Sequence, residues 1–246
     1  MTSRCCLLIC CLGLFAACLP ARAERIALTT GQDDPPFTDS SRPDGGLATR
    51  LVLEAFRSAG AQPRLDWLPW RRGYSMTRTG AYQASFPYLK TPEREQDFLY
   101  SDVIFTDYSY VWTRSGDTLS PQNPAGFKGR SICVPQSYHS PLQDLLAAMI
   151  ARNEVKVERP ETPYNCVQML AAGRIDALSG EEDEIAAPTR SMGLAGRIAQ
   201  GPPLAKLDFH VIFPRATSGS AALRDRFDAA LQRMKEDGRY ATLMTR

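Results

Sequence analysis

The stretch RIALTTGQDDPPFTDSSRPDGGLATRLVLEAFRSAGAQPRLDWLP, residues 25–69, decides the fold. Its first apolar run, residues 25–29, predicts a β-strand. Apolar residues then recur at helical spacing through residues 47–58, which predicts an amphipathic helix. Residues 64–68 alternate as a second strand, and Pro69 opens a second helix. A strand–helix–strand–helix order is typical of a parallel sheet with helices on both faces.

A second unit of the same kind follows later in the chain. Residues 131–134 and residues 175–178 are apolar runs of strand length. Between them, residues 142–150 and residues 165–172 have the apolar spacing of helices. The sequence therefore predicts two α/β units, each with a mostly parallel sheet flanked by helices.

Two strand-like segments connect these units. Residues 107–113 and 208–214 are rich in aromatic and β-branched side chains, and each is expected to cross from one unit to the other. One lobe is then expected to contain residues 24–112 and 209–246. The other is expected to contain residues 113–208, with the crossing hinge strands at its edges. Two lobes on two hinge strands form a clamp, and the cleft between them is the expected ligand site.

Composition excludes several classes of protein. The chain has 246 residues, with 29 basic and 27 acidic side chains and a formal net charge of +2. This balance excludes a polybasic nucleic-acid-binding protein and a disordered acidic tail. With 9% aromatic and 23% charged residues, the chain is expected to be globular and packed.

Residues 1–23 have the pattern of a signal peptide. Their apolar core, residues 5–19, is shorter than the roughly 20 residues that a membrane-spanning helix needs. Small residues at Ala21 and Ala23 predict cleavage after Ala23 and export to the periplasm. An alternative is lipidation at Cys18, although the aliphatic position of a lipoprotein cleavage motif is occupied by phenylalanine.

Two cysteines, Cys133 and Cys166, remain after the signal peptide is removed. An even number of cysteines in a protein exported to an oxidising compartment predicts a disulfide bond. The alternative is two separate buried thiols. A metal site is not predicted, because the remaining His139 and His210 lack ligand spacing relative to the cysteines. No cofactor is predicted.

Six short motifs occur in a fixed order along the chain. They are PPFT (35–38), GL (46–47), TPER (91–94), FLYSD (98–102), LAAGRIDA (170–177) and KEDG (235–238). Together they resemble solute-binding protein family 3, the periplasmic polar amino-acid-binding proteins of ABC importers. The resemblance implies a type II periplasmic-binding-protein-like clamp, usually monomeric, that closes on a small polar solute and serves an inner-membrane ABC permease.

The resemblance gives Arg94 a role. In the family, the arginine of the Thr-x-x-Arg motif binds the ligand carboxylate, and a planar guanidinium suits a carboxylate because it donates two parallel hydrogen bonds. The spacing of charges leaves another interpretation open. Arg94 has Glu93, Glu95 and Asp97 as sequence neighbours, with which it would form surface ion pairs on a solvated turn.

The same resemblance points to an acid in the second lobe. The family has an aspartate five residues after the aspartate of its Gly-Arg-Val/Ile-Asp-Ala motif, and this aspartate holds the ligand ammonium. Counting from Asp176 gives Glu181, which keeps the charge and is one methylene longer. The alternative is that the acidic run at residues 181–184 is a solvated helix start, where carboxylates are favourable in any case.

The expected pocket is more aromatic than the family norm. Phe37 matches the family aromatic that packs over the ligand, and Trp70 is a second expected wall residue. Tyr138 occupies the place of a small hydroxyl residue, and Tyr88 lies in a stretch that replaces small polar residues. Backbone and hydroxyl groups that would bind a ligand carboxylate are thereby lost, and we expect Tyr88 and Tyr138 to line a larger pocket.

These features favour a binding protein for import. Two alternatives stay open: a ligand-sensing module without a transporter, and a dehydratase-like enzyme on the same fold. For an enzyme, Glu181, His139 and Tyr138 are the candidate proton-transfer groups. No pair of nucleophile and base is evident in the sequence, so no catalytic residue is predicted.

Overall fold

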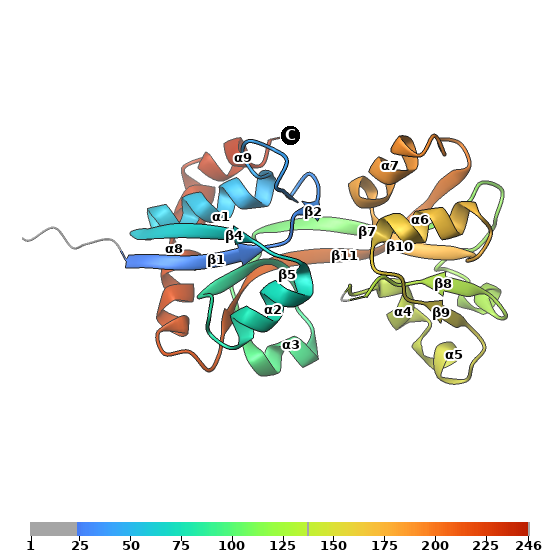
Figure 1. Ribbon diagram of the computed structural model, residues 1–246, viewed down its shortest axis with the longest axis horizontal. Helices are drawn as coiled ribbons and strands as arrows, with labels where there is room; N and C mark the ends of the chain where they lie inside the picture. The colour runs from blue at the N-terminus through green and yellow to red at the C-terminus, as the bar shows by residue number, and fades with distance from the viewer. Residues whose placement is uncertain (1–23, 137, 246) are drawn as a thin grey trace, which may run out of the picture.

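The computed structural model describes residues 24–136 and 138–245 of the chain. It has two α/β lobes, arranged end to end along the long axis of the molecule and joined by two strands (Figure 1). The predicted signal peptide, residues 1–23, and the alternative lipidation site at Cys18 lie outside the described residues. Within the described ranges, no helix combines the length and the apolar character needed to cross a bilayer.

Lobe 1 contains the N-terminal half of the chain and its C-terminal end. Three parallel strands pair in the order β4–β1–β5, and the end of β11 (Ile198–Pro214) adds antiparallel to β5 and to β6. A short hairpin of β2 and β3 follows β1. The strands are β1 (Glu24–Thr30), β2 (Asp33–Asp34), β3 (Thr38–Asp39), β4 (Ala61–Trp67), β5 (Ala84–Leu89) and β6 (Phe98–Tyr100).

Helices cover both faces of the lobe 1 sheet (Figure 1). On one face, α1, α8 and α9 pack together over the main apolar core. On the other face, α2 and α3 lie beside a smaller aromatic cluster. Residues 47–58 form a helix as the spacing predicted. The helices are α1 (Leu47–Ser58), α2 (Trp70–Arg78), α3 (Pro92–Asp97), α8 (Ser220–Glu236) and α9 (Arg239–Leu243).

Lobe 2 is built on β10, which pairs in parallel with β8, while β8 pairs in parallel with β9. Successive side chains along these strands alternate between two buried clusters, as the pleat requires. Cys133 and Leu178 belong to one cluster, whereas their neighbours Ile132 and Ala177 belong to the other. The strands are β8 (Ser131–Cys133), β9 (Lys156–Glu158) and β10 (Ala177–Glu181).

The helices of lobe 2 lie on opposite sides of this sheet, with α6 and α7 on one side and α4 and α5 on the other (Figure 1). They are α4 (Pro141–Leu145), α5 (Ala147–Ala151), α6 (Pro163–Ala171) and α7 (Glu182–Ser191), preceded by a 3-10 turn, η1 (Pro124–Phe127). The prediction of one continuous helix over residues 142–150 is wrong. At Leu146 the backbone (φ −98°, ψ 8°) leaves helical geometry, and its carbonyl accepts the N–H groups of Met149 and Ile150.

A disulfide joins Cys133 of β8 to Cys166 of α6. Both cysteines are buried in the apolar cluster beneath α6 and α7. The predicted pairing is therefore present, and it fixes a helix of lobe 2 to its sheet.

Two strands connect the lobes, and they pair antiparallel with each other over most of their length. They are β7 (Phe105–Arg114) and β11 (Ile198–Pro214). In lobe 2, β7 pairs with β10, and in lobe 1, β11 pairs with β5 and β6. The two crossing strands expected from residues 107–113 and 208–214 are thus part of one sheet that runs through both lobes.

Candidate functional site

A cavity of about 100 Å³ lies between the two lobes. Lobe 1 contributes residues of β2, α2, β5 and α3, and lobe 2 contributes the loop after β8, the strand β10 and the start of α7. The hinge strands close its base with Ser109 and Phe209. The cavity is therefore formed by segments that are far apart in the sequence.

All six residues predicted from the sequence line this one cavity. They are Arg94, Phe37, Trp70 and Tyr88 of lobe 1, and Glu181 and Tyr138 of lobe 2. The fold thus brings the predicted guanidinium and the predicted carboxylate to the same space from opposite lobes. Their role in ligand binding stays a prediction.

The Arg94 side chain is held against the end of β5. Thr91 caps α3, and its hydroxyl accepts the Arg94 backbone N–H at 3.3 Å. The guanidinium donates through Nη1 to the Leu89 carbonyl at 2.9 Å and lies 5.3 Å from the centre of the Tyr88 ring. Of the guanidinium nitrogens, the bond to Leu89 involves Nη1, and Arg94 lines the cavity.

The alternative interpretation of Arg94, as part of a solvated ion-pair cluster, is wrong for the described residues. Of its acidic sequence neighbours, Glu95 pairs with Lys90 at 2.8 Å and Asp97 approaches Arg78 at 3.7 Å. Arg94 takes part in none of the ion pairs found in residues 24–136 and 138–245. Its charge is therefore available to a ligand.

An aromatic wall lies beside Arg94. The Trp70 indole N–H donates to Asp33 at 2.8 Å, and the ring meets Tyr88 edge-on with centroids 5.8 Å apart. Trp70 also packs directly on the backbone of Gly31, where an added Cβ would lie 2.1 Å from the ring. Only glycine at position 31 allows this ring position. Phe37 is fixed separately, by stacking on Phe105 at 4.1 Å.

Two buried hydroxyls face the cavity without a protein partner. Tyr88 is 6% exposed and Ser109 is 1% exposed, and no described residue hydrogen-bonds to either side-chain oxygen. Burial also raises the pKa of Tyr88 to about 12, so its hydroxyl stays protonated. Because a buried polar group without a partner costs about 1–3 kcal/mol, both groups are suited to hydrogen-bond a bound solute.

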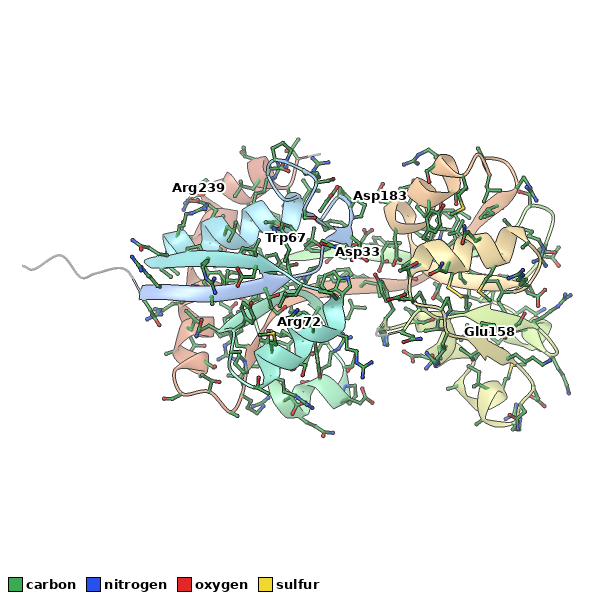
Figure 2. All side chains as sticks on the ribbon, in the orientation of Figure 1. Asp33, Trp67, Arg72, Glu158, Asp183 and Arg239 are labelled. Carbon is green, nitrogen blue, oxygen red and sulfur yellow. A yellow bond between two sulfur atoms is a disulfide. The ribbon has the colours of Figure 1, made fainter. Side chains whose placement is uncertain are left out.

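Carboxyl groups enter the cavity from both lobes. Asp34 comes from β2, whereas Glu181 precedes α7 and Glu184 lies in its first turn. Glu184 accepts the Glu181 backbone N–H at 3.3 Å. Figure 2 labels Asp33 and Asp183, which lie on opposite sides of the gap between the lobes and add to the same acidic region.

Burial and like charges disfavour ionisation of Asp34 and Glu184. Burial raises the pKa of Asp34 well above its usual value, and the charge of Glu181 across the cleft adds to the effect. Burial likewise raises the pKa of Glu184, again with Glu181 contributing. The cavity therefore holds more acidic groups than it can accommodate in ionised form.

Tyr138 of lobe 2 and Trp70 of lobe 1 lie where the cavity meets a second hollow. Both line the inner cavity and also an outer groove of about 660 Å³. Burial raises the pKa of Tyr138. The neighbouring His139 lies 3.2 Å from Asp144, so its ring is directed to α4. Tyr138 and Trp70 therefore stand between the inner cavity and the outer groove.

Sequence reasoning missed Asp34, Glu184 and Ser109. A signal for Glu184 was present, because residues 181 and 184 are three apart and share one face of a helix. Only Glu181 of the acidic run was assigned to the cleft, and the alternative treated the whole run as a solvated helix start. Asp34 and Ser109 carried no such signal, since their place at the cavity depends on how the lobes are assembled.

The fold is similar to that of several solved structures. An ancestral arginine-binding protein bound to arginine has 18% identity and a TM-score of 0.75, with 91% of this chain and 97% of that chain covered. A histidine kinase sensor domain with similarity to periplasmic binding proteins has 16% identity and a TM-score of 0.75, with coverages of 90% and 95%.

An amino acid ABC transporter substrate-binding protein from Streptococcus pneumoniae, bound to L-arginine, has 15% identity and a TM-score of 0.71, with coverages of 89% and 92%. Another similar structure is an ancestral amino acid-binding protein described as a precursor of cyclohexadienyl dehydratase. The similar structures are thus mostly binding proteins. No curated protein matches the sequence.

The family comparison agrees with the two-lobe architecture and the cavity between the lobes. The family model of the bacterial extracellular solute-binding proteins, family 3, matches residues 26–246. The match begins in β1 and includes both lobes and both hinge strands. The chain belongs to family 3 of the bacterial extracellular solute-binding proteins.

Proposed function

We propose that this chain is a periplasmic protein that captures a small polar, amino-acid-like solute between its lobes for ABC-type import. The observation that carries the proposal is that Arg94 of lobe 1 and Glu181 of lobe 2 line one cavity. A guanidinium binds a carboxylate and a carboxylate binds an ammonium, both through charge-assisted hydrogen bonds. Similar structures include proteins whose ligands are amino acids, which supports the same class of solute.

In this proposal each predicted residue has a role. Arg94 binds the carboxylate of the solute and Glu181 binds its ammonium. The aromatic residues form the walls and exclude water: Phe37, Trp70, Tyr88 and Tyr138. Trp70 and Tyr138 open to admit the solute, because they separate the inner cavity from the outer groove.

The clamp works by motion of one lobe against the other. Residues 24–112 and 209–246 move as one lobe and residues 113–208 as the other, about the strands β7 and β11. The signal peptide is removed after Ala23, and the mature chain acts as a monomer. Closure around the solute presents both lobes to an inner-membrane ABC permease.

Calorimetry on the exported protein tests this function. The panel contains the common amino acids, simple amines and simple carboxylates. Arg94→Ala should weaken binding of the tightest amino acid by a factor on the order of 10 to 1,000, since a charged hydrogen-bonded pair contributes about 1.5–3 kcal/mol or more. Arg57→Ala is the matched control, because Arg57 lies on the exposed side of α1 and pairs with Glu54 at 3.7 Å. Absence of saturable binding across the panel would overturn the proposal.

A second role is favoured by one observation. A histidine kinase sensor domain shares this fold over 90% of the chain. In that role the same clamp reports the solute to a membrane signalling protein. Addition of purified protein and solute to a permease in liposomes separates the two roles: stimulated ATP hydrolysis supports import, and cross-linking to a membrane kinase without such stimulation supports sensing.

A further inference from the structure

The described residues that line the inner cavity carry an excess of acids. Three of them are carboxylic acids, Asp34, Glu181 and Glu184, and one is a guanidinium, Arg94. His139 also lines the cavity, and its ring lies 3.2 Å from Asp144. An amino acid with a neutral side chain brings one positive and one negative charge, which leaves this excess unchanged.

These three carboxyls have no cationic partner in the described part of the protein. None of the ion pairs in residues 24–136 and 138–245 includes Asp34, Glu181 or Glu184. Arg94, the guanidinium that lines the same cavity, bonds to the Leu89 carbonyl and lies over the Tyr88 ring. The acids therefore lack the neutralising group that buried carboxylates normally have.

A second observation points to a polar ligand, because two buried hydroxyl groups are each free to donate one hydrogen bond and to accept others. The hydroxyl oxygens of Tyr88 and Ser109 are buried at the cavity without partners among the described residues. A hydroxyl oxygen has two lone pairs, so each accepts a hydrogen bond from an ammonium, which donates three and accepts none. Together with the carboxyls, the cavity offers acceptors on both lobes.

The acids also belong to different lobes. Asp34 is in lobe 1, whereas Glu181 and Glu184 are in lobe 2, and Glu181 influences the titration of Asp34 across the cleft. In the absence of a cation, closure brings the like charges of the two lobes together, which is unfavourable. A cation between Asp34 and Glu181 replaces that repulsion with attraction to both lobes.

We propose that the cavity takes a solute with at least two cationic nitrogen groups, either a basic amino acid or a diamine. The first cation bridges Asp34 and Glu181, and the second pairs with Glu184. This inference rests on the proposed binding function and names its solute class. A basic amino acid and a diamine both carry two cationic nitrogen groups. Only the amino acid also has a carboxylate, which Arg94 would bind.

Matched ligand pairs test the charge requirement by calorimetry on the exported protein. L-Arginine is compared with L-citrulline, which has the same shape and a neutral side chain, and 1,4-diaminobutane is compared with 1-aminobutane. The dicationic member should bind at least about 30-fold tighter in one of the pairs. If the arginine pair shows the preference, the solute class is basic amino acids, and if only the amine pair shows it, the class is diamines.

Variants then assign the preference to this cavity. Glu184→Gln should weaken binding of the dicationic probe by about tenfold or more and change binding of its singly charged partner by less than about threefold. The amide introduced by Glu184→Gln keeps an oxygen that accepts the Glu181 N–H, so the start of α7 is preserved. Glu182→Gln is the matched control, because Glu182 is exposed on the same helix and does not line the cavity.

Two outcomes overturn the inference and are distinguishable from failure of the proposed function. Absence of a preference for the dicationic member in both ligand pairs, with amino-acid binding still lost in Arg94→Ala, refutes the dication requirement alone. Equal effects of Glu184→Gln and Glu182→Gln on the dicationic probe refute the assignment to this cavity. Absence of binding by every probe and every amino acid refutes the binding function together with this inference.

Discussion

The two lobes differ in how their apolar cores are built. Lobe 1 has a large apolar core between its sheet and the helices α1 and α8, which includes Phe56, Phe213 and Phe227 in mutual ring contact. Lobe 2 has two smaller clusters, one on each side of its sheet, and a disulfide joins the sheet to α6. Because one face of lobe 1 supplies most of its core, its other face is free to form the aromatic cavity wall around Tyr88.

The lobes also present opposite chemistry to the cleft. Lobe 1 contributes the guanidinium and most of the aromatic rings, while lobe 2 contributes two carboxyls at the start of α7. The start of a helix favours negative charge, but burial still raises the pKa of Glu184 there, as it raises that of Asp34 in lobe 1. In the proposed function, each lobe therefore supplies part of the binding site, and full binding requires both.

The largest effect is expected from removing the disulfide of lobe 2. The variant Cys133→Ala/Cys166→Ala should lose roughly 3–4 kcal/mol of stability, since the bond closes a long loop in the unfolded chain. Calorimetry measures the loss in melting temperature, and hydrogen exchange locates it. The lobe comparison requires that amides of α6 and β8 lose protection while those of α1 keep it. Equal loss in both lobes would contradict it.

A smaller effect is expected from the wall of lobe 1. In Gly31→Ala the new methyl group overlaps the Trp70 ring, because a Cβ at position 31 lies 2.1 Å from the ring. The ring must shift and lose its bond to Asp33. Affinity for L-arginine, measured by calorimetry, should fall about tenfold, which corresponds to roughly 1.4 kcal/mol.

The control for this change is Gly126→Ala in lobe 2. A Cβ at Gly126 meets the Asn123 side chain at an ordinary 3.4 Å and lies outside the cavity. Unchanged affinity in Gly31→Ala would show that the Trp70 wall does not contribute to binding.

The smallest effect concerns a carboxyl that lies in lobe 1 outside the cleft. Burial raises the pKa of Asp228 to about 6, although it accepts the Asp102 N–H at 2.8 Å. A raised pKa means that the folded chain binds the proton more tightly than the unfolded chain. Stability therefore falls as the pH rises from about 4 to about 6, and the loss persists above that range.

Asp228→Asn should remove this loss, because an amide oxygen still accepts the Asp102 N–H and carries no charge. We expect a gain of about 1 kcal/mol at pH 7.5 after allowing for solvent screening at this half-buried site. The gain should disappear near pH 4 in thermal melts, and arginine affinity should not change. An altered affinity would show that the charge of Asp228 reaches the cleft.

Much of the fold follows from local patterns. The helix over residues 47–58 and the hinge strands were predicted, because apolar spacing and β-branched composition report which face of a segment is buried. The helix over residues 142–150 was predicted wrongly, because the turn at Leu146 does not change that spacing. For the site, the family resemblance, together with the places where the sequence departs from it, pointed to six residues that the structure places around one cavity.

The amino-acid sequence by itself determined the two α/β units, the cysteine pair and the charged groups that belong to the family motifs. Local spacing and residue type carry this information, since neighbours in the chain are neighbours in a helix or strand. Tertiary structure alone decided that Asp34, Glu184 and Ser109 meet Arg94 and Glu181 in one space. These residues are far apart in the sequence, and they meet only because the strands that join the lobes bring both lobes to one cavity. A local sequence pattern carries no information about which distant segments will be neighbours in the folded chain.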